Sequence, residues 1–288
     1  MEVFWIIVTG CLTAIACALA GSLLLVRNAS MISDAISHAV LPGIVAAFLL
    51  TGSRTGFPML IGAASVGLLS TFLMEFLHRK GRVQQDASIG ITFTMLFAIG
   101  VIMITALAGN VDIDPECVLY GEIAYVPLDM IAIAGFEIPY SVVMLSGVVL
   151  FTIGVFSIGY RQFLSTSFDP EHAESTGINT AFWHYLLMAC VSFITVAAFD
   201  AVGAILVVAL FIVPPATAFL LLKQLHHIMI ASSVFGIIAA VFGYFLADSL
   251  NGSIAGAMAV VTGLQLFLVI MLTKVLQKYQ YNKSRDIA

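Results

Sequence analysis

Two ionisable side chains lie one helical turn apart in an otherwise apolar stretch of this sequence. Asp34 and His38 are four residues apart, so a helix places both on one face. A carboxylate and an imidazole form a ligand pair that suits Mn²⁺, Fe²⁺ or Zn²⁺. Two side chains do not complete a coordination shell, so further ligands must come from another helix, an acidic segment or a second copy of the chain. The pair predicts a candidate site for a divalent metal ion.

The depth of this pair in a membrane decides how unusual it is. If a span covers residues 31–51, His38 lies about 5 Å from its centre. Ionisable side chains at that depth are costly and usually functional. Two other interpretations stay open: Asp34 caps the helix while His38 is a hydrogen-bonded core residue, or the pair relays protons. Pro42 and Gly43, just beyond the pair, predict a kink or an interruption of the helix, which is a feature of transporter spans.

A short helix with both ends marked is predicted within the polar stretch 160–179. Asp169 suits the N-cap, Pro170 the first helical position, and Gly177 the residue past the end. Two interpretations stay open for this helix. It is either an interfacial amphipathic helix without a partner or a docking helix for a cytoplasmic protein.

The elements that position these residues must be membrane-spanning helices. Of the 288 residues, 61% are hydrophobic and 9% are charged, whereas a soluble domain carries about 25% charged residues. No basic stripe is present, which argues against a nucleic-acid partner. The four cysteines include no CxxC pair, which argues against a zinc ribbon. No phosphate-binding loop, HExxH or GxSxG motif occurs, so we expect a transport subunit without a cofactor, not an enzyme, and any ATP hydrolysis would need a separate subunit.

Runs of about 20 apolar residues, the length that crosses a bilayer, predict an all-α polytopic bundle of about nine spans within one transmembrane domain, 1–288. The two spans within 180–222 are joined by almost nothing, so one of them is open to being broken or re-entrant, and we accept a count of eight to ten. The predicted spans are 3–26, 31–51, 57–77, 88–109, 140–159, 180–199, 201–222, 228–247 and 254–274.

The basic residues predict the orientation of this bundle. With nine spans and the N-terminus outside, only Arg54 of the eleven Lys and Arg residues falls on the outer side. Such asymmetry is what the positive-inside rule requires. We therefore expect the C-terminal tail, 276–288, to be cytoplasmic together with the loops 78–86 and 160–179.

The outer segment 110–139 is acidic. It is either an ordinary solvated loop or a funnel that concentrates cations at a metal entrance. The spacing does not decide between the two. The carboxylates that we consider for metal entry are Asp112, Asp114, Glu116 and Glu122.

Small residues recur at every fourth position in two predicted spans, which favours close packing of helix backbones in a compact bundle. Other titratable residues suggest less specific roles. We expect Glu75 and His78 to lie at the membrane interface, and His184 to make a local hydrogen bond near the end of its span. The small-residue series are Gly10, Ala14, Ala18 and Ser22, and Ala35, Ala39, Gly43 and Ala47.

Five ordered segments resemble the permease subunits of the manganese/zinc/iron ABC importer family, also called the ABC-3 family. The stretch Asp34–Gly43 is similar to the signature of that family's second helix, and Ser167–Ala173 is similar to its coupling segment. Three further stretches, Ala87–Ile91, Val118–Ile123 and Val202–Ala218, are similar to a following span, an outer segment and a late apolar run.

The resemblance implies an ATP-driven importer of Mn, Zn or Fe in a bacterial plasma membrane. It implies two permeases, identical or related, an extracytoplasmic metal-binding protein, and cytoplasmic ATPase subunits that dock on the 168–177 coupling helix. It also implies that Asp34 and His38 handle the metal. An importer of haem, cobalamin or siderophore chelates and a transporter driven by an ion gradient remain alternatives. The residues implied in ATPase coupling are Phe168, Asp169, Pro170, Glu171, Ala173 and Gly177.

Overall fold

The computed structural model describes residues 2–52, 57–107, 123–133 and 136–285. Almost all of this part is helical, as the hydropathy predicts. The elements are α1 (Glu2–Val26), α2 (Met31–Ala39), α3 (Leu41–Thr51), α4 (Phe57–Arg79), α5 (Gln85–Leu107), the 3₁₀ helix η1 (Ile123–Leu128), β1 (Met130–Ile133), β2 (Phe136–Pro139), α7 (Tyr140–Ile158), α8 (Tyr160–Phe168), α9 (Pro170–Ser175), α10 (Thr180–Val202), α11 (Ala204–Leu221), α12 (Leu225–Leu250) and α13 (Ile254–Arg285).

The expectation of about nine spans is confirmed. Nine stretches in the described part are long and apolar enough to cross a membrane, with α2 and α3 counted as one. The uncertain pair is resolved into two continuous helices, α10 and α11, which are separated only by Gly203. Gly203 has a φ of 81°, a conformation that favours glycine because it lacks a Cβ.

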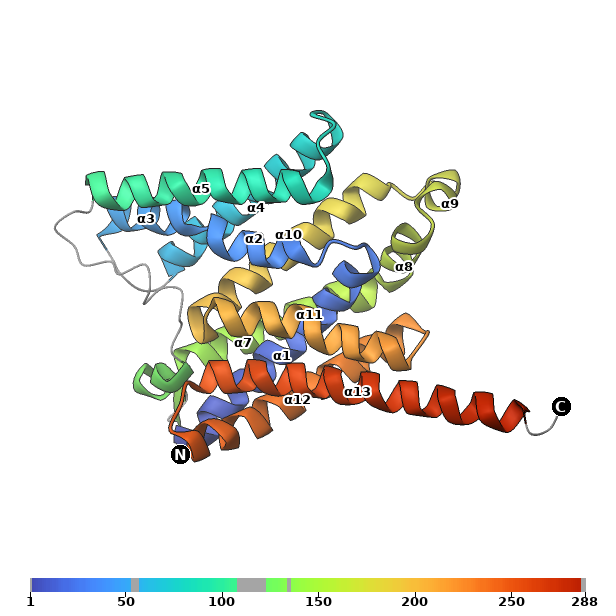
Figure 1. Ribbon diagram of the computed structural model, residues 1–288. Helices are drawn as coiled ribbons and strands as arrows, with labels where there is room; N and C mark the ends of the chain where they lie inside the picture. The colour runs from blue at the N-terminus through green and yellow to red at the C-terminus, as the bar shows by residue number, and fades with distance from the viewer. Residues whose placement is uncertain (1, 53–56, 108–122, 134–135, 286–288) are drawn as a thin grey trace.

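The helices form two groups that α10 joins, together with a direct contact between α2 and α11 (Figure 1). In the first group α1 packs on α7, α11 and α12, and α13 packs on α11 and α12. In the second group α2, α3, α4 and α5 pack on one another. Helix α10 contacts α1, α7 and α11 on one side and α2 and α4 on the other. The bundle core therefore centres on α1 and α10.

The small-residue series of α1 lies against α12, as close packing predicts. A Cβ on Gly236 would lie 2.8 Å from the Cβ of Ala14, and one on Gly10 would lie 3.2 Å from the Cβ of Ala240. Further along, Ser22 Oγ donates a hydrogen bond to Ser232 Oγ at 3.3 Å. The two helices run antiparallel in close contact because neither presents a bulky side chain along this seam.

The span 31–51 is broken where Pro42 and Gly43 predict an interruption. Helix α2 ends at Ala39 and α3 begins at Leu41, with Val40 as the cap between them. Pro42 has no N–H and cannot donate to the carbonyl of His38, four residues earlier. Gly43 is needed for another reason: a Cβ there would lie 2.3 Å from the carbonyl oxygen of Gly62 in α4.

Three local features differ from the sequence expectations. The polar stretch 160–179 holds two short helices instead of one, and Phe168 ends α8 instead of starting the capped helix. The backbone of 276–285, expected as a tail, continues α13 to Arg285. In the acidic outer segment, Met130–Ile133 and Phe136–Pro139 form an antiparallel hairpin, a small addition to the all-α fold.

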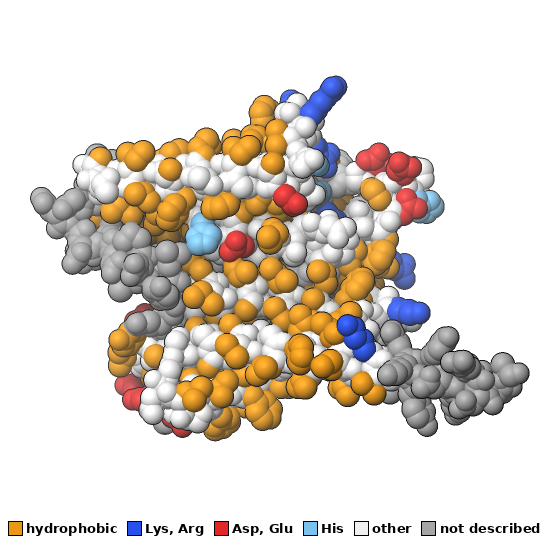
Figure 2. Space-filling model, viewed as in Figure 1, with side chains coloured by type: hydrophobic (Ala, Val, Ile, Leu, Met, Phe, Trp, Pro, Cys, Tyr) orange, Lys and Arg blue, Asp and Glu red, His pale blue; other side chains and the backbone are white. Residues whose placement is uncertain are grey.

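The charged side chains divide between the two ends of the bundle. Figure 2 shows Lys and Arg side chains gathered at the end that carries α8, α9 and the α4–α5 turn. The opposite end carries the N-terminus, η1 and the hairpin (Figure 1). The described basic residues share one end, as the segmentation predicts. The basic residues with described side chains are Arg27, Arg79, Lys80, Arg82, Arg161, Lys223 and Lys274.

Candidate functional site

The predicted metal pair lies on the surface of α2, within the apolar span Met31–Thr51. His38 Nε2 is 3.6 Å from Asp34 Oδ1, and the two side chains are 32% and 46% exposed. Figure 2 shows acidic and histidine side chains next to one another in an otherwise apolar region below α5. The opposite face of α2, with Ile36 and Ala35, is buried in the core. The fold of this chain leaves both side chains accessible to a third group.

Aromatic rings of α5 flank the imidazole. The ring centroids of Phe93 and Phe97 lie 6.0 Å and 6.1 Å from that of His38. The two rings flank the imidazole, and the His38 side chain is still 32% exposed. Within the described residues, no cluster of three or more His, Cys, Asp or Glu side chains could hold a metal ion. The pair by itself is therefore no complete metal site within the described residues.

The capped helix of the coupling segment has the ends that its sequence predicts. Asp169 Oδ1 accepts a hydrogen bond from the backbone N–H of His172 at 3.0 Å, Pro170 opens α9, and Gly177 follows it with a φ of 82°. Ala173 is buried, whereas Phe168 and Glu171 are exposed. The end of α8 and the start of α9 thus place an exposed apolar ring next to an acidic side chain at the basic end of the bundle.

The four carboxylates considered for metal entry lie outside the described residues. They are Asp112, Asp114, Glu116 and Glu122.

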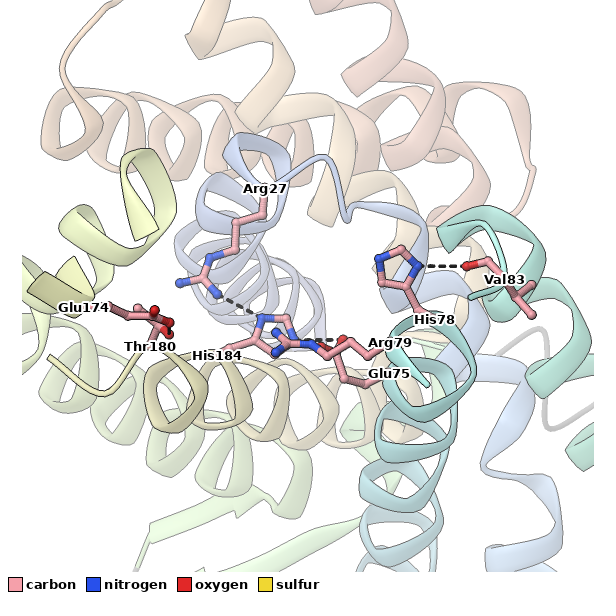
Figure 3. A network of polar contacts seen from close by, with 8 residues as sticks. All are labelled: Arg27, Glu75, His78, Arg79, Val83, Glu174, Thr180 and His184. Carbon is pink, nitrogen blue, oxygen red and sulfur yellow. Dashed lines mark hydrogen bonds and ion pairs between the residues drawn. The ribbon is translucent and has the colours of Figure 1, made fainter. Parts of the chain in front are cut away.

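A polar network at the same end as α9 joins four helices, and sequence reasoning missed it. Arg27, just past the end of α1, donates to Ser167 Oγ at 2.9 Å, to Thr166 Oγ1 at 2.9 Å and to His184 Nδ1 at 3.1 Å. Figure 3 shows Arg27 and Glu75 on opposite sides of His184. Burial lowers the pKa of the Arg27 guanidinium to about 10, so the group is charged at neutral pH.

His184 continues the network to α4. Its Nε2 lies 3.2 Å from Glu75 Oε2, and the same carboxylate pairs with Arg79 one turn further along α4. The expectation of a local hydrogen bond for His184 was wrong, because its partners lie 157 and 109 residues away in the chain. His78 does not join the network: its ring contacts the carbonyl of Val83 at 3.0 Å. No spacing in the sequence signals contacts between such distant residues.

Comparison with known proteins gives the family of this chain. Residues 2–274 match the model of the ABC 3 transport family. The chain belongs to the ABC 3 transport family. It is 50% identical over 260 residues to "Manganese transport system membrane protein MntD" of Bacillus subtilis, covering 90% of this chain and 88% of that protein. The resemblance read from the five segments is thereby confirmed.

Two further relatives agree with this membership. "Zinc transport system membrane protein TroD" of Treponema pallidum is 37% identical, over 94% of this chain and 73% of that protein. The solved structure "PsaBC from Streptococcus pneumoniae in complex with Fab" superposes with a TM-score of 0.76 at 30% identity, over 92% of this chain and 89% of that one. This member of the ABC 3 family is a membrane-spanning transport permease whose fold is shared by a solved structure.

Proposed function

We propose that this chain is the permease subunit of an ATP-driven importer of divalent transition-metal ions, with manganese as the first candidate substrate. The Asp34–His38 pair carries the proposal. A carboxylate and an imidazole lie 3.6 Å apart within an apolar span, open to a third group, and both are ligands for Mn²⁺ and Zn²⁺. The relatives named for manganese and zinc transport support the same substrate class.

The broken span adds a reason for metal handling at this point. Pro42 cannot donate to the carbonyl of His38, so the usual helical bond is missing just after the pair, at the break between α2 and α3. The remaining ligands would come from a second permease, identical or related, that covers this face. Coordination by both chains would hold the ion briefly on a path between them.

The assembly has further parts in this proposal. The chain contains no phosphate-binding loop, so ATP is hydrolysed by cytoplasmic ATPase subunits. These dock on the 168–177 segment, where Phe168, Asp169, Pro170, Glu171, Ala173 and Gly177 shape α9 and its ends. An extracytoplasmic protein delivers the metal at the opposite end of the bundle, past Asp112, Asp114, Glu116 and Glu122. The basic end faces the cytoplasm of a bacterial plasma membrane.

Uptake of manganese by cells tests the metal pair. In a strain whose chromosomal copy carries Asp34→Asn together with His38→Ala, we expect initial Mn²⁺ uptake to fall about tenfold or more, because both ligands are lost. Both side chains are part-exposed, so the amount of chain in the membrane should not change. Asp86→Asn and His226→Ala are matched controls, since both residues are exposed and lie outside the pair.

Undiminished uptake by the double variant would refute the site. Other outcomes separate the alternative functions. Competition by a haem or siderophore chelate, without competition by free metal, would point to a chelate importer. Uptake that stops when the ion gradient is dissipated while ATP is maintained would point to a gradient-driven transporter.

A further inference from the structure

His184 stands where the two helix groups meet at the basic end of the bundle. It lies in the second turn of α10, which Asn179 caps by accepting a hydrogen bond from the N–H of Phe182 at 3.0 Å. One ring nitrogen contacts Arg27 of the α1 group, and the other contacts Glu75 of the α4 group. The network therefore crosses the boundary between the groups, on the helix that already packs against both.

One tautomer of the imidazole satisfies both contacts. A guanidinium has no acceptor, so Arg27 must donate and His184 Nδ1 must accept. The ring is then neutral, its proton is on Nε2, and it donates to the carboxylate of Glu75. Each nitrogen has a different task, and a protonated ring could not keep the bond to Arg27.

The charges around His184 argue against a second metal site. The carboxylate of Glu75 pairs with the Arg79 guanidinium and with His184, whose other ring nitrogen contacts the Arg27 guanidinium. This excess of positive charge repels a divalent cation. The network consequently holds the protein together at this point and does not hold a substrate ion.

The short helices α8 and α9 are fastened to the bundle through this network. Thr166 and Ser167, in the last turn of α8, accept two hydrogen bonds from Arg27. Glu174 of α9 accepts a hydrogen bond from Thr180 at 2.5 Å, at the first residue of α10 (Figure 3). A displacement of α8 and α9 therefore pulls on α1 and α10 together.

The far side of the network borders α2. Glu75 and His184 line one pocket with His78, Gln85, Ser88 and Ile32. Ile32 belongs to α2 and precedes Asp34 by two residues. Contacts thus run from α8 through Arg27 to His184 and Glu75, which lie on two helices, α10 and α4, that both pack against α2.

We propose that His184 is a positioning residue that connects the two helix groups, so that movement of α8 and α9 reaches α2. We call the connection from Arg27 through His184 to Glu75 the tie. The inference rests on the proposed function, because docked ATPase subunits would supply that movement. His184 touches no metal in this role. It acts by keeping Arg27 and Glu75 at a fixed separation.

Uptake kinetics in cells test the tie. We expect His184→Ala to lower the maximal rate of Mn²⁺ uptake about tenfold, the factor that corresponds to losing a hydrogen bond with a charged group. The KM for Mn²⁺ should not change, because the metal pair is intact. His184→Gln should restore most of the rate, since a glutamine amide can accept from Arg27 and donate to Glu75. Arg161→Met, at an exposed position of α8, is the control for charge removal near the network.

A double variant tests whether the residues act as one unit. Arg27→Met and His184→Ala should together lower the rate no further than either does alone. Multiplied effects would overturn the tie, as would a normal rate in His184→Ala or a His184→Gln variant as defective as His184→Ala. A rate loss that only follows loss of the chain from the membrane would also overturn it.

A distance measurement on the purified chain in lipid nanodiscs tests the tie independently of any uptake measurement. Spin labels at Glu171→Cys on α9 and Lys80→Cys after α4, with the natural cysteines replaced by alanine, should give a narrow distance distribution that broadens in His184→Ala and is narrow again in His184→Gln. Identical distributions in all three would overturn the tie. If the wild-type chain takes up no Mn²⁺, the proposed function fails, and this measurement still decides on His184.

Discussion

Two carboxylate–imidazole pairs in this chain differ in the cations that surround them. Asp34 and His38 have no guanidinium among the contacts seen in the described residues, and both are part-exposed. Glu75 and His184 lie between Arg27 and Arg79 and are less exposed. The same residue types therefore favour different roles. The first pair is the one that we propose to bind a cation, whereas the carboxylate of the second is already paired with Arg79 and His184.

The N-cap of α9 gives a prediction for a single residue. Asp169→Ala removes the side chain that accepts from the N–H of His172 and should destabilise α9 by about 1 kcal/mol. Limited proteolysis of the purified chain should then cut faster within 168–177. Asp169→Asn is the matched variant, because asparagine caps equally well. Equal cleavage of both variants would contradict the importance of the cap.

Close approaches between helices decide the packing at the scale of elements. A Cβ on Gly21 of α1 would lie 2.1 Å from the carbonyl oxygen of Phe211 in α11, so any larger residue pushes the two helices apart. We expect Gly21→Ala to destabilise the chain by about 1–3 kcal/mol, measured as a lower Tm in detergent. Gly147→Ala in α7 is the control, since nothing lies within 4 Å of its added Cβ.

An equal loss of Tm in these two alanine variants would contradict the prediction, because it would show that the contact between α1 and α11 does not set the effect. We expect Gly147→Ala to keep or raise the Tm, because alanine at an uncrowded helical position is favoured over glycine by about 1 kcal/mol. The comparison therefore separates backbone contact from the intrinsic cost of glycine.

The orientation of the whole molecule is open to a direct test. The basic end carries α9, and the other end carries the start of α1 (Figures 1 and 2). The positive-inside rule predicts that the basic end faces the cytoplasm. With the natural cysteines replaced by alanine, an impermeant thiol reagent should label Glu2→Cys in intact cells and Glu171→Cys only after permeabilisation. The reverse pattern would overturn the orientation.

Coupling between the two helix groups is a property of the whole molecule. Helix α10 packs against both groups along its length, while Arg27, His184 and Glu75 add a polar connection at one end. The position of the connection beside α8 and α9 is the reason to look for its effect in the rate and not in metal affinity.

The sequence by itself determined the spans, the break before Pro42 and the cap at Asp169. Each depends on local physics: the length of an apolar run, the missing N–H of proline, and a carboxylate three residues before a free N–H. It also placed Asp34 and His38 on one face, because residues four apart meet on a helix.

Only the tertiary structure decided which distant polar groups meet. The partners of His184 lie on helices separated from it by more than a hundred residues, and no periodicity within one helix specifies the neighbour that its side chains reach. The tertiary structure also decided that α8 precedes α9 and that the metal pair stays open at the surface of the chain. These outcomes depend on how nine spans pack against one another, which hydropathy does not encode because every span is similarly apolar.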